Sequence, residues 1–212
     1  AFRVYGDQSF VKHRNCKDTQ LLMPLSPLNQ QKILAKIRNI TPRGKTPIAY
    51  SISQAPLDLA GAIGSSVVLL ITDGIESCEG DPAEAAAKLF KSGIKTKLHV
   101  IGYDVGNEEH KANLAKIAQA GGGMFFSAGS GVELTDAIVQ AATVDYNILN
   151  TKGEIVLKDT VGSKMHELKI GDYRLEVDME PQLVLEDLQI LKNQKTEVLL
   201  LQQGDSFKIA VQ

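Results

Sequence analysis

Short apolar segments alternate with amphipathic helical segments through the first two thirds of this chain of 212 residues. Each apolar segment has the length of a strand, and each segment between them repeats its apolar residues at helical spacing. This alternation predicts an α/β domain with a doubly wound, mostly parallel sheet. We expect the strands at residues 2–5, 20–24, 67–72, 97–102 and 124–127.

Capping residues mark where the helices begin. Asn29 can cap a helix that ends before the turn at residues 42–44. Pro47 can begin the next helix, since its missing N–H costs nothing in the first turn, and Asp81 has the position of a third cap. Two further helices are expected at residues 107–121 and 132–142.

The pattern changes near residue 144, where apolar and polar residues begin to alternate without any helical segment. Short strands at such regular spacing are typical of a small antiparallel β-sandwich. We therefore expect two domains, an α/β domain at residues 1–143 and a β-sandwich module at residues 144–212. The predicted strands of the module are 146–149, 154–158, 165–170, 173–179, 183–191, 196–201 and 206–211.

The composition argues against several classes of protein. A net charge of −2 and a sequence pI near 6.1 provide no basic footprint for nucleic acid or an anionic membrane. No apolar run approaches the ~20 residues of a membrane span. The histidines are scattered and no catalytic motif is present, so we expect a protein without enzymatic activity. Because the chain opens at Ala1 inside an apolar segment, we expect it to be processed or incomplete.

The segment Gly44-Lys45-Thr46 is similar to the end of a phosphate-binding P-loop. Such a loop needs an earlier glycine at the position that Asn39 occupies here, and a strand must lead into it. A helix is expected there instead. Nucleotide binding is therefore not predicted.

A carboxylate follows the most apolar strand of the chain. The strand at residues 67–72 ends in Thr72, Asp73 and Gly74. In open parallel sheets ligands bind beyond the carboxyl ends of the strands, which makes Asp73 a candidate functional residue. From spacing alone, the same carboxylate could instead cap the following turn.

Three segments are similar to successive landmarks of bacterial von Willebrand factor type A domains: Pro42-Arg43-Gly44-Lys45-Thr46-Pro47-Ile48-Ala49, Leu70-Ile71-Thr72-Asp73-Gly74-Ile75-Glu76-Ser77-Cys78 and His99-Val100-Ile101-Gly102-Tyr103-Asp104. The resemblance covers residues 1–143. The remaining residues resemble the small β-sandwich modules that follow such domains, most clearly at Gly171-Asp172-Tyr173-Arg174-Leu175-Glu176-Val177.

The resemblance implies a protein-binding or adhesion module that holds one divalent cation, Mg²⁺ or alternatively Mn²⁺ or Ca²⁺, at a metal-ion-dependent adhesion site. Carried over to this sequence, the metal ligands are Thr46 and Asp73, whose oxygens suit such a hard cation. Glu76 and Asp104 lie near the same face by topology and are candidates for contact with the partner. The partner is expected to be a protein that offers a carboxylate.

The family's remaining metal ligands lie in a D-x-S-x-S loop after the first strand. Asp7 and Ser9 imitate half of that loop, but Val11 replaces the second serine and too few residues separate Asp7 from Thr46. We therefore interpret residues 2–5 as the family's second strand. Because the first strand lies mid-sheet in this family, its place must be filled by upstream residues or by another polypeptide.

The resemblance also places Cys16 and Cys78 in loops on the metal-binding face. A disulfide between them is expected rather than two free thiols, and it would imply an oxidising compartment. The chain is then predicted to be secreted, periplasmic or at the bacterial cell surface. Two other functions stay open: a structural subunit of an extracellular or periplasmic assembly with a vestigial metal site, and a cation-dependent hydrolase.

Overall fold

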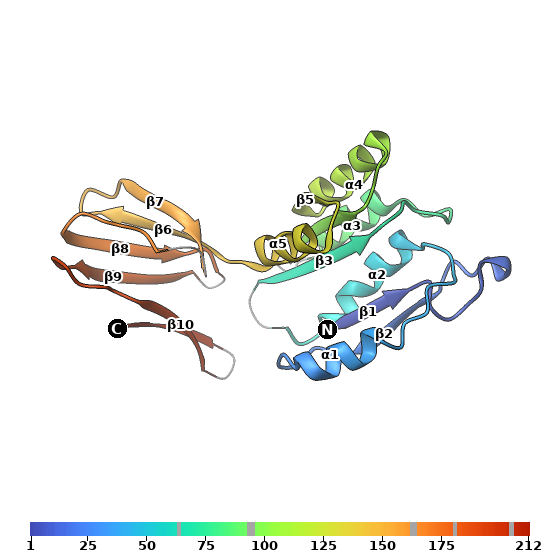
Figure 1. The fold of residues 1–212 in the computed structure, drawn as a ribbon, viewed down its shortest axis with the longest axis horizontal. Coiled ribbons are helices and arrows are strands. Elements are labelled where there is room, and N and C mark those ends of the chain that lie inside the picture. The colour runs from blue at the N-terminus through green and yellow to red at the C-terminus, as the bar shows by residue number, and fades with distance from the viewer. Residues whose placement is uncertain (63–64, 93–95, 162–164, 180–181, 204–205) are drawn as a thin grey trace. The chain divides into compact units, whose positions relative to one another are not determined.

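The computed structural model describes residues 1–62, 65–92, 96–161, 165–179, 182–203 and 206–212. The chain divides into two compact units (Figure 1). The first comprises residues 1–62 and 66–141, and the second includes residues 142–212.

The first unit has the predicted α/β architecture. Its parallel sheet has the order β3-β4-β5, and its other two strands, β1 and β2, form a separate antiparallel pair. The elements are β1 (Phe2–Tyr5), a 3-10 turn η1 (Val11–His13), β2 (Thr19–Met23), α1 (Gln30–Ile37), α2 (Ile48–Asp58), β3 (Ser66–Thr72), α3 (Pro82–Phe90), β4 (Thr96–Tyr103), α4 (Glu108–Ala120), β5 (Gly122–Ala128) and α5 (Gly131–Ala142).

The helices begin where the sequence places their caps. The Asn29 side chain accepts a hydrogen bond from Lys32 N, and the Asp81 side chain accepts bonds from Ala83 N and Glu84 N. These bonds satisfy N–H groups that have no partner within the first helical turn. Pro47 is the residue immediately before α2.

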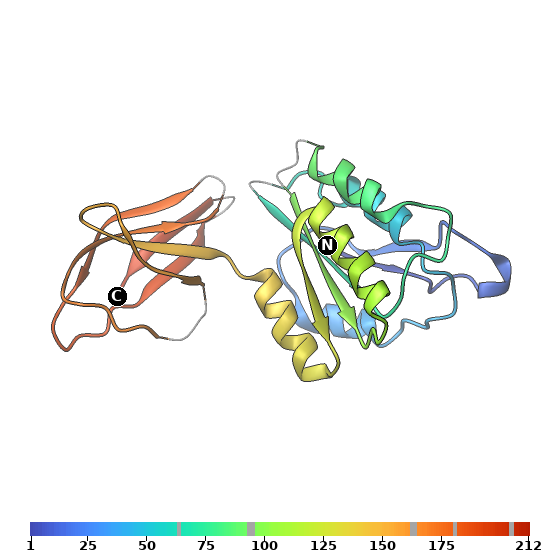
Figure 2. The same cartoon turned by 90° about the horizontal axis from the view of Figure 1, so that it is seen from above.

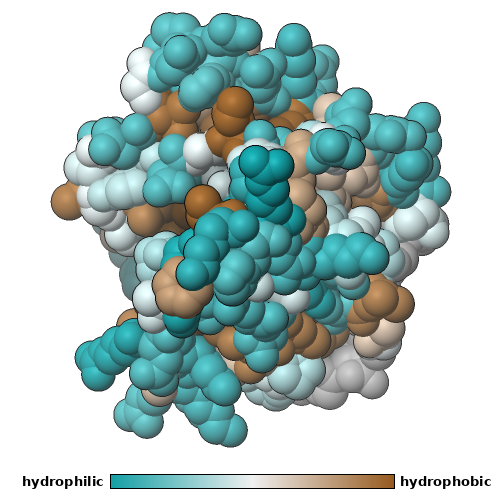
Figure 3. All heavy atoms as spheres, turned by 90° about the vertical axis from the view of Figure 1, so that its right-hand side faces the viewer, coloured by the Kyte–Doolittle hydropathy of each residue, from teal (hydrophilic) through white to brown (hydrophobic). Residues whose placement is uncertain are grey.

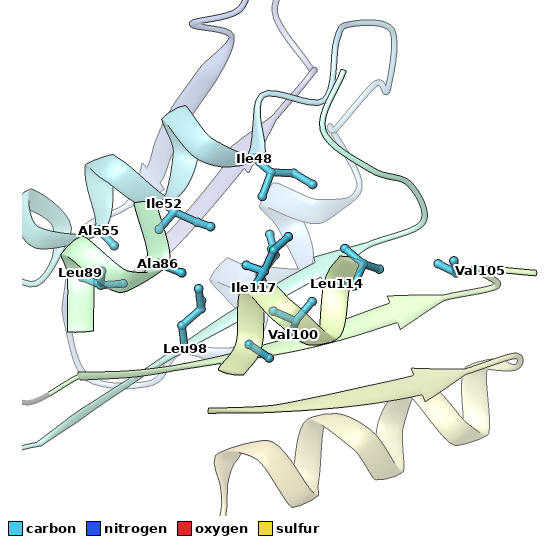
Figure 4. Packing of buried hydrophobic residues seen from close by; sticks show 12 residues of the cluster. Ile48, Ile52, Ala55, Ala86, Leu89, Leu98, Val100, Val105, Leu114 and Ile117 are labelled. Carbon is cyan, nitrogen blue, oxygen red and sulfur yellow. The ribbon is translucent and has the colours of Figure 1, made fainter. Parts of the chain in front are cut away.

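Helices cover both faces of the parallel sheet. Residues of α2, α3 and α4 pack on one face, and Ala137 of α5 packs with Ile101 and Ala128 on the other (Figure 4). Figure 2 shows α3 and α4 side by side. Burial of this apolar surface is the main stabilising contribution to the unit. The larger cluster includes Ile48, Ile52, Leu70, Ala86, Leu89, Leu98, Val100, Leu114 and Ile117.

Two strand edges lack a partner in the part of the chain that the structure describes. β3 is hydrogen-bonded to β4 alone, and β1 to β2 alone. Between these edges, the Tyr5 hydroxyl donates a hydrogen bond to the Ile71 carbonyl at 3.1 Å. Val67 and Ile71 of β3 are 47% and 42% exposed, and α1 buries none of its residues. This side of the unit therefore keeps apolar surface in contact with solvent.

The second unit is all-β. A four-stranded antiparallel sheet has the order β7-β6-β8-β9, and β10 and β11 form an antiparallel hairpin. Ile148, Leu175, Val177 and Leu188 form its core. The predicted strand at residues 165–170 is wrong, because this segment has no ladder partner. The strands are β6 (Asp145–Asn150), β7 (Ile155–Thr160), β8 (Gly171–Val177), β9 (Leu183–Ile190), β10 (Val198–Gln203) and β11 (Ser206–Val211).

Candidate functional site

The candidate site lies at the carboxyl ends of β3 and β4, which we call the top face. Asp73 directly follows β3 and Asp104 directly follows β4. In the parallel register Thr72 is paired with Gly102, so the two acids leave the sheet at the same edge. Both are exposed, and Asp104 has a φ of 52°, an uncommon backbone conformation for a residue with a side chain.

Thr46, just before α2, is held against the loop that follows β3. Its backbone N–H donates to Ser77 Oγ at 2.7 Å, and Ser77 N–H donates to the Thr46 carbonyl at 3.2 Å. This reciprocal pair joins two segments that are 31 residues apart in sequence. The structure thus brings the loops of both predicted metal ligands together.

Glu76 is engaged with the backbone. One carboxylate oxygen accepts from Ala49 N at 2.7 Å, in the first turn of α2, and the other accepts from Cys78 N at 2.8 Å. The N-terminal end of a helix favours negative charge, so this carboxylate stabilises α2 from the neighbouring loop. Glu76, which the sequence offers as a candidate for contact with a partner, thus bonds to the backbone of this site through both oxygens.

Asp73 has a different environment. The turn after β3 is closed by Thr72, whose hydroxyl accepts from Gly74 N at 3.2 Å and donates to the Gly74 carbonyl at 3.0 Å. The Asp73 carboxylate takes no part in this turn, and within the described ranges it has no hydrogen bond or ion pair. The sequence left open whether Asp73 is a functional residue or caps this turn. The turn is capped by Thr72, so Asp73 remains a candidate functional residue.

Tyr5 lies beside these acids. Burial raises the pKa of its hydroxyl above the ordinary value of 10.0. The negative charges of Asp73 and Glu76 raise that pKa further, while the hydrogen bond with Thr72 acts in the opposite direction. Tyr5 thus connects β1 to the candidate site, a role for which the sequence carries no signal.

A buried carboxylate organises the loops next to the site. Asp18 is 1% exposed and accepts hydrogen bonds from Gln8 N at 3.1 Å and Ser9 N at 2.8 Å. Gly44 packs so closely that an added Cβ would lie 2.7 Å from an Asp18 carboxylate oxygen. The loop that carries Asp7 and Ser9 is therefore shaped by backbone bonds to Asp18, and Asp7 itself accepts from Thr41 N at 2.5 Å.

A disulfide joins Cys16 to Cys78, with 5.7 Å between their Cα atoms, as expected. It links the loop between β1 and β2 to the loop between β3 and α3, across the two separate sheets of the first unit. The disulfide thus anchors the loop that carries Glu76 and that is hydrogen-bonded to Thr46.

The oxygen donors on this face are of the kind that a hard divalent cation prefers, but they supply only part of its coordination shell. Thr46 offers a hydroxyl and Asp73 a carboxylate, whereas Mg²⁺ prefers six oxygen ligands in octahedral geometry. Throughout the residues that the structure describes, no three His, Cys, Asp or Glu side chains come close enough together to hold a metal ion. Any bound cation would need further ligands from water, from a partner or from additional residues.

The sequence matches the von Willebrand factor type A domain family over residues 16–140. The chain belongs to the von Willebrand factor type A domain family. Domains of this family generally act as protein-interaction modules, and the expected bacterial resemblance is confirmed by two relatives.

Both relatives come from Bacillus subtilis (strain 168). The uncharacterized protein YwmC is 37% identical over 131 residues, which cover 59% of this chain and 56% of YwmC. The uncharacterized protein YwmD is 36% identical over 144 residues, which cover 64% of this chain and 62% of YwmD. The match thus spans about three fifths of the length of each relative.

Proposed function

We propose that the chain is a non-enzymatic module that binds a protein partner through its top face, with a divalent cation held in part by Thr46 and Asp73. The observation that carries the proposal is the free Asp73 carboxylate at the end of an apolar parallel strand, beside a loop fixed by Thr46 and Ser77. The cation would leave a position for a carboxylate of the partner. Asp104 is exposed at the same edge and would contact that partner.

Replacement of Asp73 tests the cation in this proposal. We expect Asp73→Ala to lose Mg²⁺ binding in calorimetry and cation-dependent capture of the partner, with an unchanged circular dichroism spectrum. Asp136→Ala, an exposed acid on α5, is the matched control and should bind as the parent does. Binding that survives in Asp73→Ala, or that ignores a chelator, would contradict the cation mechanism.

We also propose that the unpaired edges of β1 and β3 receive a strand that is supplied by upstream residues or by another polypeptide. The support is the pair of free edges, the exposed Val67 and Ile71, and the unburied α1. An open edge is a ready template for pairing with another strand, and such a strand would also cover the apolar side chains of β3. The same strand would bring the loop that completes the metal shell.

Mass spectrometry of the protein from its native source distinguishes the two origins. A covalent chain that extends beyond Ala1 would identify upstream residues, and a separate bound peptide would identify a second polypeptide. An intact chain of 22.9 kDa that unfolds cooperatively by itself would contradict the proposed strand.

A structural subunit of an extracellular assembly is the second candidate function. It is favoured by the incomplete set of metal donors among the described side chains. In that case the top face would bind its neighbour without a cation. Equal affinity for the partner in Mg²⁺ and in excess chelator, together with loss of binding on a top-face charge reversal such as Asp104→Lys, would select this candidate.

The proposed place of action is outside the cytoplasm, in a secreted, periplasmic or cell-surface protein. The support is the Cys16–Cys78 disulfide, because such bonds persist in oxidising compartments. None of the helices in the described part of the chain has the length and apolar character needed to cross a membrane.

A further inference from the structure

Two basic loops lie beside the candidate site. The loop between β1 and β2 carries Lys12, Arg14 and Lys17, and no acidic residue occurs from position 10 to position 17. The loop between α1 and α2 carries Arg43, and no acidic residue occurs from position 38 to position 45. This concentration of positive charge contrasts with the net charge of −2 of the whole chain.

These loops lie at the right-hand side of Figure 1, where the blue segment carries η1. Figure 3 looks at that side of the molecule and shows hydrophilic residues over most of the face, with separate hydrophobic patches between them. We use the term basic loop patch for Phe10, Lys12, Arg14, Lys17 and Arg43, all of which are exposed.

The positive charges of the patch are not neutralised within the described part of the chain. None of Lys12, Arg14, Lys17 and Arg43 forms an ion pair there, whereas Arg3 is paired with Asp58 at 2.6 Å. The nearest acids in these loops are occupied, because Asp18 is buried against backbone N–H groups and Asp7 accepts from Thr41 N. The patch therefore offers a partner cations that have no ion-pair partner among the described residues.

An exposed aromatic ring lies beside two of these cations. Phe10 is 53% exposed, the Arg43 guanidinium lies 5.3 Å from its ring centroid and the Lys12 ammonium lies 5.8 Å from it. An aromatic ring beside arginine is the composition that dominates the binding energy of many protein interfaces. The patch can therefore contact an apolar side chain and carboxylates at once.

The patch is also held in place before any partner arrives. Val11 N–H donates to the Arg43 carbonyl at 2.7 Å, which ties the two loops together. Asn15 donates to Ser9 Oγ at 2.9 Å, and Cys16 is fixed by its disulfide. A surface that is already ordered loses less entropy on binding.

We propose that the basic loop patch binds an acidic segment of the protein partner, with carboxylates on its lysines and arginines and an apolar side chain on Phe10. This inference rests on the proposed function, since it assigns a second contact to the same protein partner. Charge complementarity selects an acidic segment, because the patch carries exposed cations and no carboxylate, and the proposed function makes that segment part of a protein.

The test measures binding of a labelled Asp/Glu-rich peptide that contains one Leu to the full chain, by fluorescence anisotropy. We expect Phe10→Ala and Arg43→Gln each to weaken binding about tenfold, which is more than truncation of most interface residues does. We also expect affinity to fall as salt is raised. The matched controls are Phe90→Ala and Lys88→Gln, both exposed on α3, which should bind as the parent does.

Parent-like affinity of the patch variants, with unchanged circular dichroism, would overturn the inference. It would also be overturned if phosphatidylglycerol vesicles or duplex DNA bound the chain through the patch while the acidic peptide did not. The same titrations in chelator and with Asp73→Ala separate the two proposals. Binding that needs the patch but neither cation nor Asp73 supports the patch alone, whereas binding that needs Asp73 but not the patch supports the proposed function alone.

Discussion

At the scale of single residues, Asp18 shows how one buried charge determines the shape of a functional surface. Its carboxylate accepts two backbone N–H bonds and is almost completely covered. Hydrogen bonds to a charged group are stronger than those between neutral groups. The loop that carries Phe10 and Lys12 begins directly after the two N–H donors, Gln8 and Ser9.

We predict that Asp18→Ala destabilises the first unit by about 2–3 kcal/mol, because Gln8 N and Ser9 N lose a charged acceptor and the cavity left behind is not refilled. Urea unfolding monitored by circular dichroism measures the change. Asp136→Ala, which removes an exposed acid from α5, should change the free energy of unfolding by less than about 0.5 kcal/mol. Equal effects of the two substitutions would contradict the role assigned to Asp18.

The raised pKa of Tyr5 predicts a loss of stability at alkaline pH. The folded state holds the phenolic proton of Tyr5 more tightly than the unfolded state does. Ionisation of Tyr5 therefore leaves the free energy of unfolding unchanged below pH 10.0 and lowers it as the pH rises above 10.0. Tyr5→Phe should remove that part of the decline, at a cost of about 1 kcal/mol at neutral pH from the lost bond to the Ile71 carbonyl. Urea titrations between neutral and alkaline pH test this, and identical alkaline slopes for parent and variant would refute it.

At this scale the sequence predicted some site residues and missed others. Asp73 was identifiable because it follows an apolar strand, and the structure leaves its carboxylate free. Asp18 and Tyr5 were missed, because burial of a polar residue depends on loops that meet only in the folded chain. The capping role of Glu76 was missed for the same reason, since its acceptor contact with Ala49 crosses 27 residues of sequence.

At the scale of elements, β3 is the strand whose open edge we expect to govern self-association of the chain. It is a run of seven residues, all apolar between Ser66 and Thr72, with one side unpaired among the described residues. An open edge of this kind is a template for pairing with another chain, and natural proteins protect such edges with lysine. The edge of β3 carries no such residue.

We predict that Val67→Lys lowers self-association of the isolated chain, because a charge on the open edge opposes pairing between copies. Light scattering over a concentration series measures this. Val132→Lys, at a more exposed position on α5, serves as the control and should leave self-association unchanged. A parent-like association of Val67→Lys would show that β3 is not the adhesive edge.

In the second unit, alternation of apolar and polar residues does not by itself determine which segments form strands. Residues 165–170 alternate as a strand does, but they pair with neither edge strand of the sheet, β7 or β9. The segment makes a side-chain contact instead, in which the Tyr173 hydroxyl donates to the Lys169 carbonyl at 2.8 Å. Alternation predicts extended chain, whereas a strand also needs backbone hydrogen bonds to a neighbouring strand. The remaining six strands of the unit and the α/β order of the first unit follow the sequence pattern.

At the scale of the whole molecule, the disulfide is a covalent cross-link between loops of the two sheets of the first unit. It closes a segment of 62 residues, which by loop entropy contributes about 4 kcal/mol. We predict that the double variant Cys16→Ser and Cys78→Ser loses stability of that order in the transition of the first unit, while the all-β unit is unaffected. Reductant should reproduce the loss in the parent and have no effect on the double variant. A parent that is indifferent to reductant would contradict the prediction.

The connection between α2 and β3 lies between the two bonded cysteines in the sequence. Ala60 and Gly61 are exposed, and nothing lies within 4 Å of the position where a Gly61 side chain would be. A protease that cut the peptide bond between them would divide the polypeptide between the two cysteines. The fragments would stay together through the sulfur atoms and would migrate as one species on a gel until a thiol was added.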